Sequence, residues 1–120
     1  TFSEVYMNEA GHVEFQYTAR AGEALVTAFC TPEGKAFGLI VGAPAAIGVV
    51  MADTAVKSAN VDVVGYCSPS SSAMSNEVIL QICGDSGAVK QAVKTARDVG
   101  LALLETMGEQ PKNKGNAYII

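Results

Sequence analysis

The sequence predicts a single α/β domain in which a sheet of about four strands is covered by helices on one side. Short apolar runs at residues 36–41, 61–66 and 77–83 have the composition of β-strands. Longer segments beside them repeat apolar residues every three or four positions, as helices with one buried face do. Of the 120 residues, 49% are hydrophobic and only 17% are charged, a balance that favours a packed core over disorder.

The first half of the chain predicts a strand, a short helix and a second strand. Residues 13–18 alternate apolar and polar side chains, which is typical of a half-buried strand. A short helix is predicted over residues 22–29, and the apolar run at 36–41 is typical of a central strand. Pro44 is expected at the first position of the following helix, where its missing N–H costs nothing.

The second half predicts a helix, two strands and a long helix. Asn60 is expected to end the first of these helices in a left-handed cap, and the strand at 61–66 then requires a crossover. The long helix follows a turn at residues 84–86 and is expected to end at Gly108. The predicted buried positions of the two helices are Ile47, Val50, Met51, Thr54 and Ala55, and then Val89, Ala92, Val93, Ala96, Val99, Gly100, Leu103, Leu104 and Met107. The order β-α-β-α-β-β-α is related to the ferredoxin-like split βαβ theme, and the strands at 36–41 and 61–66 are either parallel neighbours or split.

The domain is expected to span residues 1–108, followed by a polar C-terminal tail at 109–120 that contains Pro111 and Gly115. Residues 36–52 carry no charge, but this stretch is interrupted by glycine and proline and is shorter than the roughly 20 residues that a membrane span needs. We therefore interpret it as a buried strand followed by a buried helix.

Charge and cysteine content exclude several classes of function. A formal net charge of −4 argues against binding a phosphate backbone, and the absence of Trp removes a common stacking platform for single strands. The cysteines are three in number (Cys30, Cys67 and Cys83) and form no CxxC pair, which favours a reducing cytoplasm over a disulfide framework.

Two local patterns resemble chemical sites but have simpler structural interpretations. Residues 84–87 (GDSG) resemble the nucleophile sequence of trypsin-type proteases, yet the chain has one histidine and is too short for that double barrel, so a helix cap at Asp85 or Ser86 is favoured. Gly38, Gly42 and Gly48 resemble a phosphate loop without its Lys-Ser/Thr. Close strand–helix packing is favoured there, and a small-ligand or nucleotide-binding regulatory domain is the alternative function.

A third pattern, Glu9, His12 and Glu14, could be written as a metal site. A strand places residues 12 and 14 on one face, but Glu9 lies before a glycine, so a third ligand is not well placed. We favour exposed charges here, and we expect no metal, no cofactor and no catalytic residue.

Two motifs in order resemble the signature of bacterial microcompartment shell proteins. Residues 51–66 (MADTAVKSANVDVVGY) resemble the family's A-D-x-x-x-K-x-A-x-V helix end with its following strand, and residues 84–89 (GDSGAV) resemble the opening of its second long helix. Further matches resemble the second half of the tandem-domain B subfamily, known from propanediol- and ethanol-utilising compartments. They are residues 4–6, 8–12, 16–20, 41–45 and 109–113.

The resemblance implies a circularly permuted shell domain, because a strand and a short helix precede the first signature. The subfamily carries two such domains per chain and assembles as a trimer that mimics a hexamer. We therefore expect this chain to be the C-terminal part of a tandem protein, which associates into trimers (pseudohexamers) or hexamers and sheets and contacts other shell proteins. The expected location is the compartment shell in the cytoplasm, with no nucleic-acid or membrane partner and no enzymatic activity.

The resemblance also assigns roles to residues. Lys57 and Asn60 match the tile edge, where the lysine would extend its apolar stem across a symmetric contact; a lysine that only complements the helix dipole is a compatible alternative. The loop that would face a pore consists of Ser68, Pro69, Ser70, Ser71, Ser72, Ala73, Met74 and Ser75. Its hydroxyls and amides would favour small polar metabolites in transit, while an ordinary surface loop is the alternative.

Overall fold

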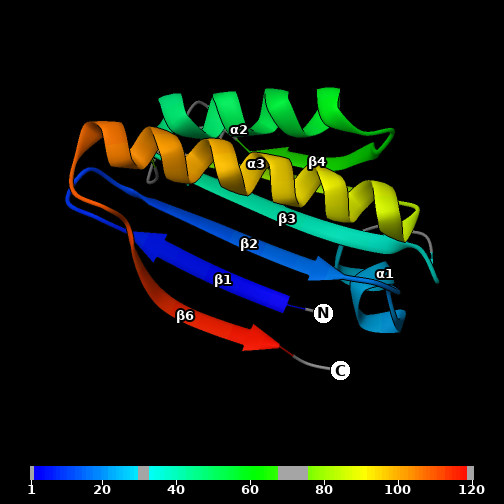
Figure 1. Cartoon of the computed structure of the whole chain (residues 1–120). Coiled ribbons are helices and arrows are strands. Elements are labelled where there is room, and N and C mark those ends of the chain that lie inside the picture. The colour runs from blue at the N-terminus through cyan, green and yellow to red at the C-terminus, as the bar shows by residue number, and fades with distance from the viewer. Residues whose placement is uncertain (1, 30–32, 68–75, 119–120) are drawn as a thin grey trace.

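The computed structural model describes residues 2–29, 33–67 and 76–118, which form six strands and three helices (Figure 1). In chain order they are β1 (Phe2–Met7), β2 (His12–Thr18), α1 (Glu23–Phe29), β3 (Ala36–Ala43), α2 (Ala45–Ser58), β4 (Asp62–Cys67), β5 (Val78–Gly84), α3 (Ser86–Met107) and β6 (Lys112–Tyr118). The seven elements that the sequence predicted are all present, and β1 and β6 are additional.

The strands form one sheet in the order β4-β5-β3-β2-β1-β6, and every neighbouring pair is antiparallel. Because β5 lies between β3 and β4, these two strands run parallel without touching each other. Of the two arrangements that the crossover allowed, the split one is therefore correct.

The described sheet has six strands, whereas the sequence predicted about four. The expected polar tail is also wrong for residues 112–118, which form β6 and pair with β1 from Phe2 opposite Tyr118 to Met7 opposite Lys112. The sequence of β6, KNKGNAY, has no apolar alternation, so periodicity gives no signal for it. The strand forms because β1 offers backbone donors and acceptors at a sheet edge, and these need partners whatever the side chains are.

Helices α2 and α3 lie side by side on one face of the sheet, and α1 lies at the end of the sheet where β2 leads into β3 (Figure 1). The core lies between these two helices and the strands. Its helical contribution comes from Ile47, Met51, Ala52, Ala55, Val89, Ala92, Val93, Ala96 and Leu104. Val50 and Met107, which were predicted to be buried, are 43% and 52% exposed. Helix α2 also ends at Ser58, with Ala59 extended, two residues before the predicted cap at Asn60.

Close contact between β3 and α2 explains two of the glycines. A Cβ atom on Gly42 would lie 2.6 Å from the Cα of Gly48, and one on Gly48 would lie 2.5 Å from the Cβ of Val78. The helix is thus oriented with Gly48 toward the sheet, which leaves Val50 outside. The packing interpretation of these glycines is confirmed, and the space that a phosphate would need between strand and helix is filled.

Residues 36–52 form β3 and the first turns of α2, as predicted from their uncharged sequence. In the described part of the chain, no helix has both the length and the apolar character to cross a bilayer.

Candidate assembly surface

Exposed apolar side chains gather where α2 borders β4. Val49 and Val56 on α2 and Val63 and Tyr66 on β4 are between 39% and 52% exposed. Together with Ala52, Asp53 and Leu80 they line a shallow groove, which we call the edge groove. Strand β4 ends the sheet and pairs only with β5 within the described residues. Apolar side chains beside an open strand edge indicate a surface that another protein covers.

Lys57 lies at the rim of this groove, in the last turn of α2. Its Nζ lies 2.9 Å from Oδ2 of Asp53, which lines the groove one helical turn earlier, and both side chains are more than half exposed. Such an exposed i,i+4 pair contributes only about 0.3–0.5 kcal/mol to folding. Lys57 therefore contributes little to the stability of the domain, and its expected contact across a tile edge stays a prediction.

Asn60 is exposed just after α2 and borders a second shallow pocket. The other residues around that pocket are Lys35, Asp62, Cys83, Gly84 and Asp85. Burial raises the pKa of the Cys83 thiol above its ordinary value, and the charge of Asp62 raises it further, while Lys35 opposes them. Cys83 is therefore protonated at neutral pH and is not an activated nucleophile.

The predicted pore loop, Ser68 to Ser75, lies outside the described residues. Its flanks are described: Cys67 at the end of β4 lies opposite Ile79 near the start of β5.

The GDSG pattern forms no catalytic pair with His12. Ser86 begins α3, close to Gly84, which pairs with Ala36 at the start of β3, whereas His12 pairs with Ala43 at its other end. Seven steps along the strand, at about 3.3 Å each, put these ends about 23 Å apart. Asp85 occupies the N-cap position as predicted, but its side chain makes no capping hydrogen bond and instead lies 3.6 Å from Nζ of Lys35.

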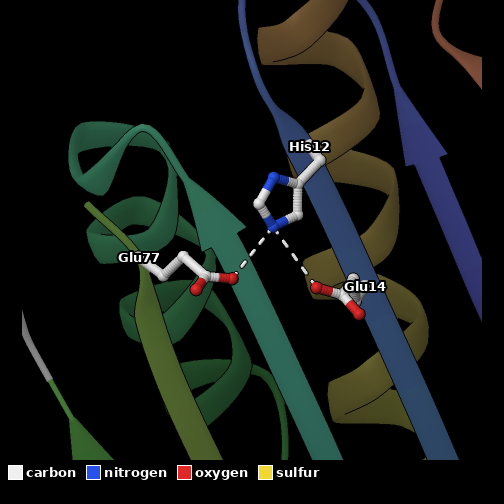
Figure 2. A network of polar contacts seen from close by, with 3 residues as sticks. All are labelled: His12, Glu14 and Glu77. Carbon is white, nitrogen blue, oxygen red and sulfur yellow. Dashed lines mark hydrogen bonds and ion pairs between the residues drawn. The ribbon is translucent and has the colours of Figure 1, made fainter. Parts of the chain in front are cut away.

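The metal pattern that the sequence suggested is only partly assembled. Glu9 lies apart from it and accepts a hydrogen bond from the backbone N–H of Glu109 at 2.7 Å. His12 and Glu14 instead meet Glu77: Nε2 of His12 lies 2.9 Å from Oε2 of Glu77 and 3.3 Å from Oε2 of Glu14 (Figure 2). Glu77 stands 65 residues from His12, and only the strand register brings the two together.

A buried ion pair between β1 and α3 was also missed. Glu4 is 6% exposed, and its Oε1 lies 3.3 Å from Nε of Arg97, although this N–H is not aligned for a hydrogen bond. The Tyr6 hydroxyl donates to Glu4 at 2.7 Å and accepts from Nη2 of Arg97 at 3.1 Å. Burial, assisted by Glu4, raises the pKa of Tyr6. These contacts link Glu4 and Tyr6 of β1 to Arg97 of α3, so the cluster has a structural role.

The fold and the edge groove together define a class of protein: a small split-βαβ domain with an exposed apolar surface along one edge of its sheet. Residues 36–110 match the BMC domain family, and the chain belongs to that family. Since β1, β2 and α1 precede this match, the chain has the permuted element order that the sequence predicted.

Individual relatives agree with this assignment. The chain is 61% identical over 120 residues to the bacterial microcompartment shell protein PduB of Salmonella typhimurium, covering 99% of this chain and 44% of that protein. A crystal structure of a trimeric bacterial microcompartment shell protein PduB matches with a TM-score of 0.85 at 52% identity, over 96% of this chain and 51% of that one. The crystal structure of EtuB from Clostridium kluyveri matches with a TM-score of 0.82 at 44% identity, over 91% and 48%. The chain thus spans about half the length of the relatives it matches.

Proposed function

We propose that this domain is the C-terminal half of a tandem shell protein that tiles the wall of a bacterial microcompartment, within the cytoplasm, of the propanediol- or ethanol-utilising kind. Identities of 44–61% to proteins named PduB and EtuB support this role. One of them is described as trimeric, and this domain covers half of its chain. Three chains of two domains each place six domains around one axis, a pseudohexamer with closed symmetry.

The observation that supports the proposal most directly is the edge groove. A domain that stood alone would leave Val49, Val56, Val63 and Tyr66 in water beside an open strand edge. A neighbouring domain would cover both the apolar side chains and the strand edge at once. The function then resides in repeated side-by-side contacts, and catalysis is not part of it.

Two further roles belong to the same proposal. Lys57 and Asn60 form contacts at the tile edge, since both are exposed at the end of α2. Residues 68–75 line a passage for small polar molecules between domains, because hydroxyl and amide groups favour such solutes over apolar ones.

Replacement of Lys57 by alanine tests the tile edge. Because the Asp53 pair contributes so little to folding, Lys57→Ala should leave the melting temperature within a few degrees and keep the small oligomer, but abolish flat arrays. Native mass spectrometry measures the oligomer, and negative-stain electron microscopy measures the arrays.

Lys90→Ala is the matched control, since Lys90 is an exposed lysine on α3 away from the groove. Arrays should persist in that variant. Unchanged arrays in Lys57→Ala would show that the edge assignment is wrong. A strictly monomeric protein, both alone and joined to a first shell domain, would overturn the proposed function as a whole.

A further inference from the structure

We propose that His12, Glu14 and Glu77 form a binding site for a single divalent transition-metal ion, of which Zn²⁺ is the best suited. The imidazole Nε2 points at two carboxylates, with Oε2 of Glu77 at 2.9 Å and Oε2 of Glu14 at 3.3 Å (Figure 2). One donor atom from each residue lies within 4.8 Å of the others. This site is independent of the tile contacts proposed above.

The sheet holds the three side chains in place. His12 and Glu14 are two residues apart on β2 and share its face, opposite to the core residue Val13. On β3, His12 lies opposite Ala43, and Gly42 lies opposite Val78 of β5, so the register brings Glu77 level with Ala43. His12 and Glu77 therefore reach toward each other (Figure 2). The register places the small residue Ala43 between them, on the face away from α2 and α3.

The distances suit tetrahedral coordination. Zn²⁺ binds imidazole nitrogen and carboxylate oxygen at about 2.0–2.2 Å, which places neighbouring ligand atoms of a tetrahedron about 3.3–3.6 Å apart. The separation between His12 and Glu14, 3.3 Å, is already in this range, and the separation between His12 and Glu77, 2.9 Å, needs only a slight widening. The carboxylates are at the ends of long side chains, and small rotations bring the third separation into range.

Charge and ligand type select the kind of ion. Two carboxylates and one imidazole carry a net charge of −1 even when the imidazole is protonated, so a dication balances the cluster better than a proton does. Ca²⁺ takes six to eight oxygen ligands, whereas an imidazole with two carboxylates suits zinc and its neighbours. The three side chains are 27–40% exposed, so water can reach the ion and complete its coordination.

The site can be tested by titrating chelator-treated protein with Zn²⁺ alone, in competition with a chromophoric chelator. We expect saturable binding of one ion per chain in the micromolar range. Glu77→Gln and His12→Gln should each weaken it by about tenfold or more, since each removes a ligand. Glu105→Gln changes an exposed carboxylate on α3 and should have no effect. Cys67→Ser should also leave the affinity unchanged, which separates this site from the exposed thiol.

A second measurement uses the unaltered chain and does not depend on variants that fold. His12 is the only histidine in the sequence, so its ring signals in an NMR spectrum are uniquely assigned. Stoichiometric Zn²⁺ should shift the Nε2 resonance strongly. Absence of that shift, binding of several ions without saturation, or an affinity that neither Glu77→Gln nor His12→Gln changes would each overturn the proposal.

Discussion

Glu4 shows how a charged residue is accommodated in the core of this domain. Its carboxylate lies under α3 at 6% exposure, with Arg97 and Tyr6 as partners. The Arg97 guanidinium is also 5.7 Å from the centre of the Tyr6 ring, where a cation–π contact is favourable. A buried carboxylate needs such partners, because leaving it unpaired costs more than the pair itself gains.

Removal of Arg97 should therefore destabilise the fold. We expect Arg97→Ala to lower the free energy of unfolding by about 2 kcal/mol, less than for a fully buried pair because the arginine is 30% exposed. Urea denaturation followed by circular dichroism measures this. In the double variant Glu4→Gln with Arg97→Ala, part of the stability should return. If the two effects simply add, the ion pair is not coupled.

The contact between β3 and α2 depends on the absence of side chains at two positions. Gly42 and Gly48 face each other across the strand–helix interface, and the side chain of Val78 on β5 also packs against Gly48. Any Cβ atom at residue 48 would require the helix to move away from the strand, because the nearest atoms include backbone. The position of α2, and with it the edge groove, follows from this contact.

Gly48→Ala should lower the free energy of unfolding by about 1–3 kcal/mol, in spite of the better helix propensity of alanine. Gly87→Ala is the matched control, because nothing lies within 4 Å of a Cβ atom at that position in the first turn of α3. That variant should gain about 0.5–1 kcal/mol. Thermal unfolding of both variants decides the matter, and equal effects would contradict the packing argument.

At the scale of the molecule, the helices cover one face of the sheet and one lateral edge remains apolar. At this edge, the exposed Val49 and Val56 of α2 and the exposed Val63 of β4 line the same groove. The opposite edge is β6, whose described sequence is polar. This asymmetry suits a domain that meets neighbours in a fixed orientation.

A charge placed in the edge groove should prevent assembly without unfolding the domain. Val56→Glu is expected to reduce the native mass, because an unpaired carboxylate would be buried in the contact. Val50→Glu changes a similarly exposed valine on the same helix, outside the groove, and should assemble normally. Size-exclusion chromatography with light scattering compares the two. Normal assembly of Val56→Glu would mean that the groove is not a contact surface.

Periodicity and turn residues predicted seven of the elements, because these signals are local. The predicted buried face of α3 is correct from Val89 to Leu104. The predicted buried face of α2 is rotated by part of a turn, because the contact at Gly48 sets how that helix lies on the sheet. No strand was predicted before Val13, because Glu4 interrupts the apolar pattern there. Burial of Glu4 depends on its ion pair with Arg97, which lies on a helix far along the chain.

The sequence by itself determined the family, the order of seven of the elements and the position of Lys57 near the end of its helix, because motifs and helical spacing are properties of neighbouring residues. Only the tertiary structure decided that residues 112–118 join the sheet, that Glu77 meets His12 in place of Glu9, and that α2 and β4 share an apolar groove. Each of these depends on strand register or on an available sheet edge. Such relations between residues far apart in the chain are fixed by backbone pairing and leave no local pattern.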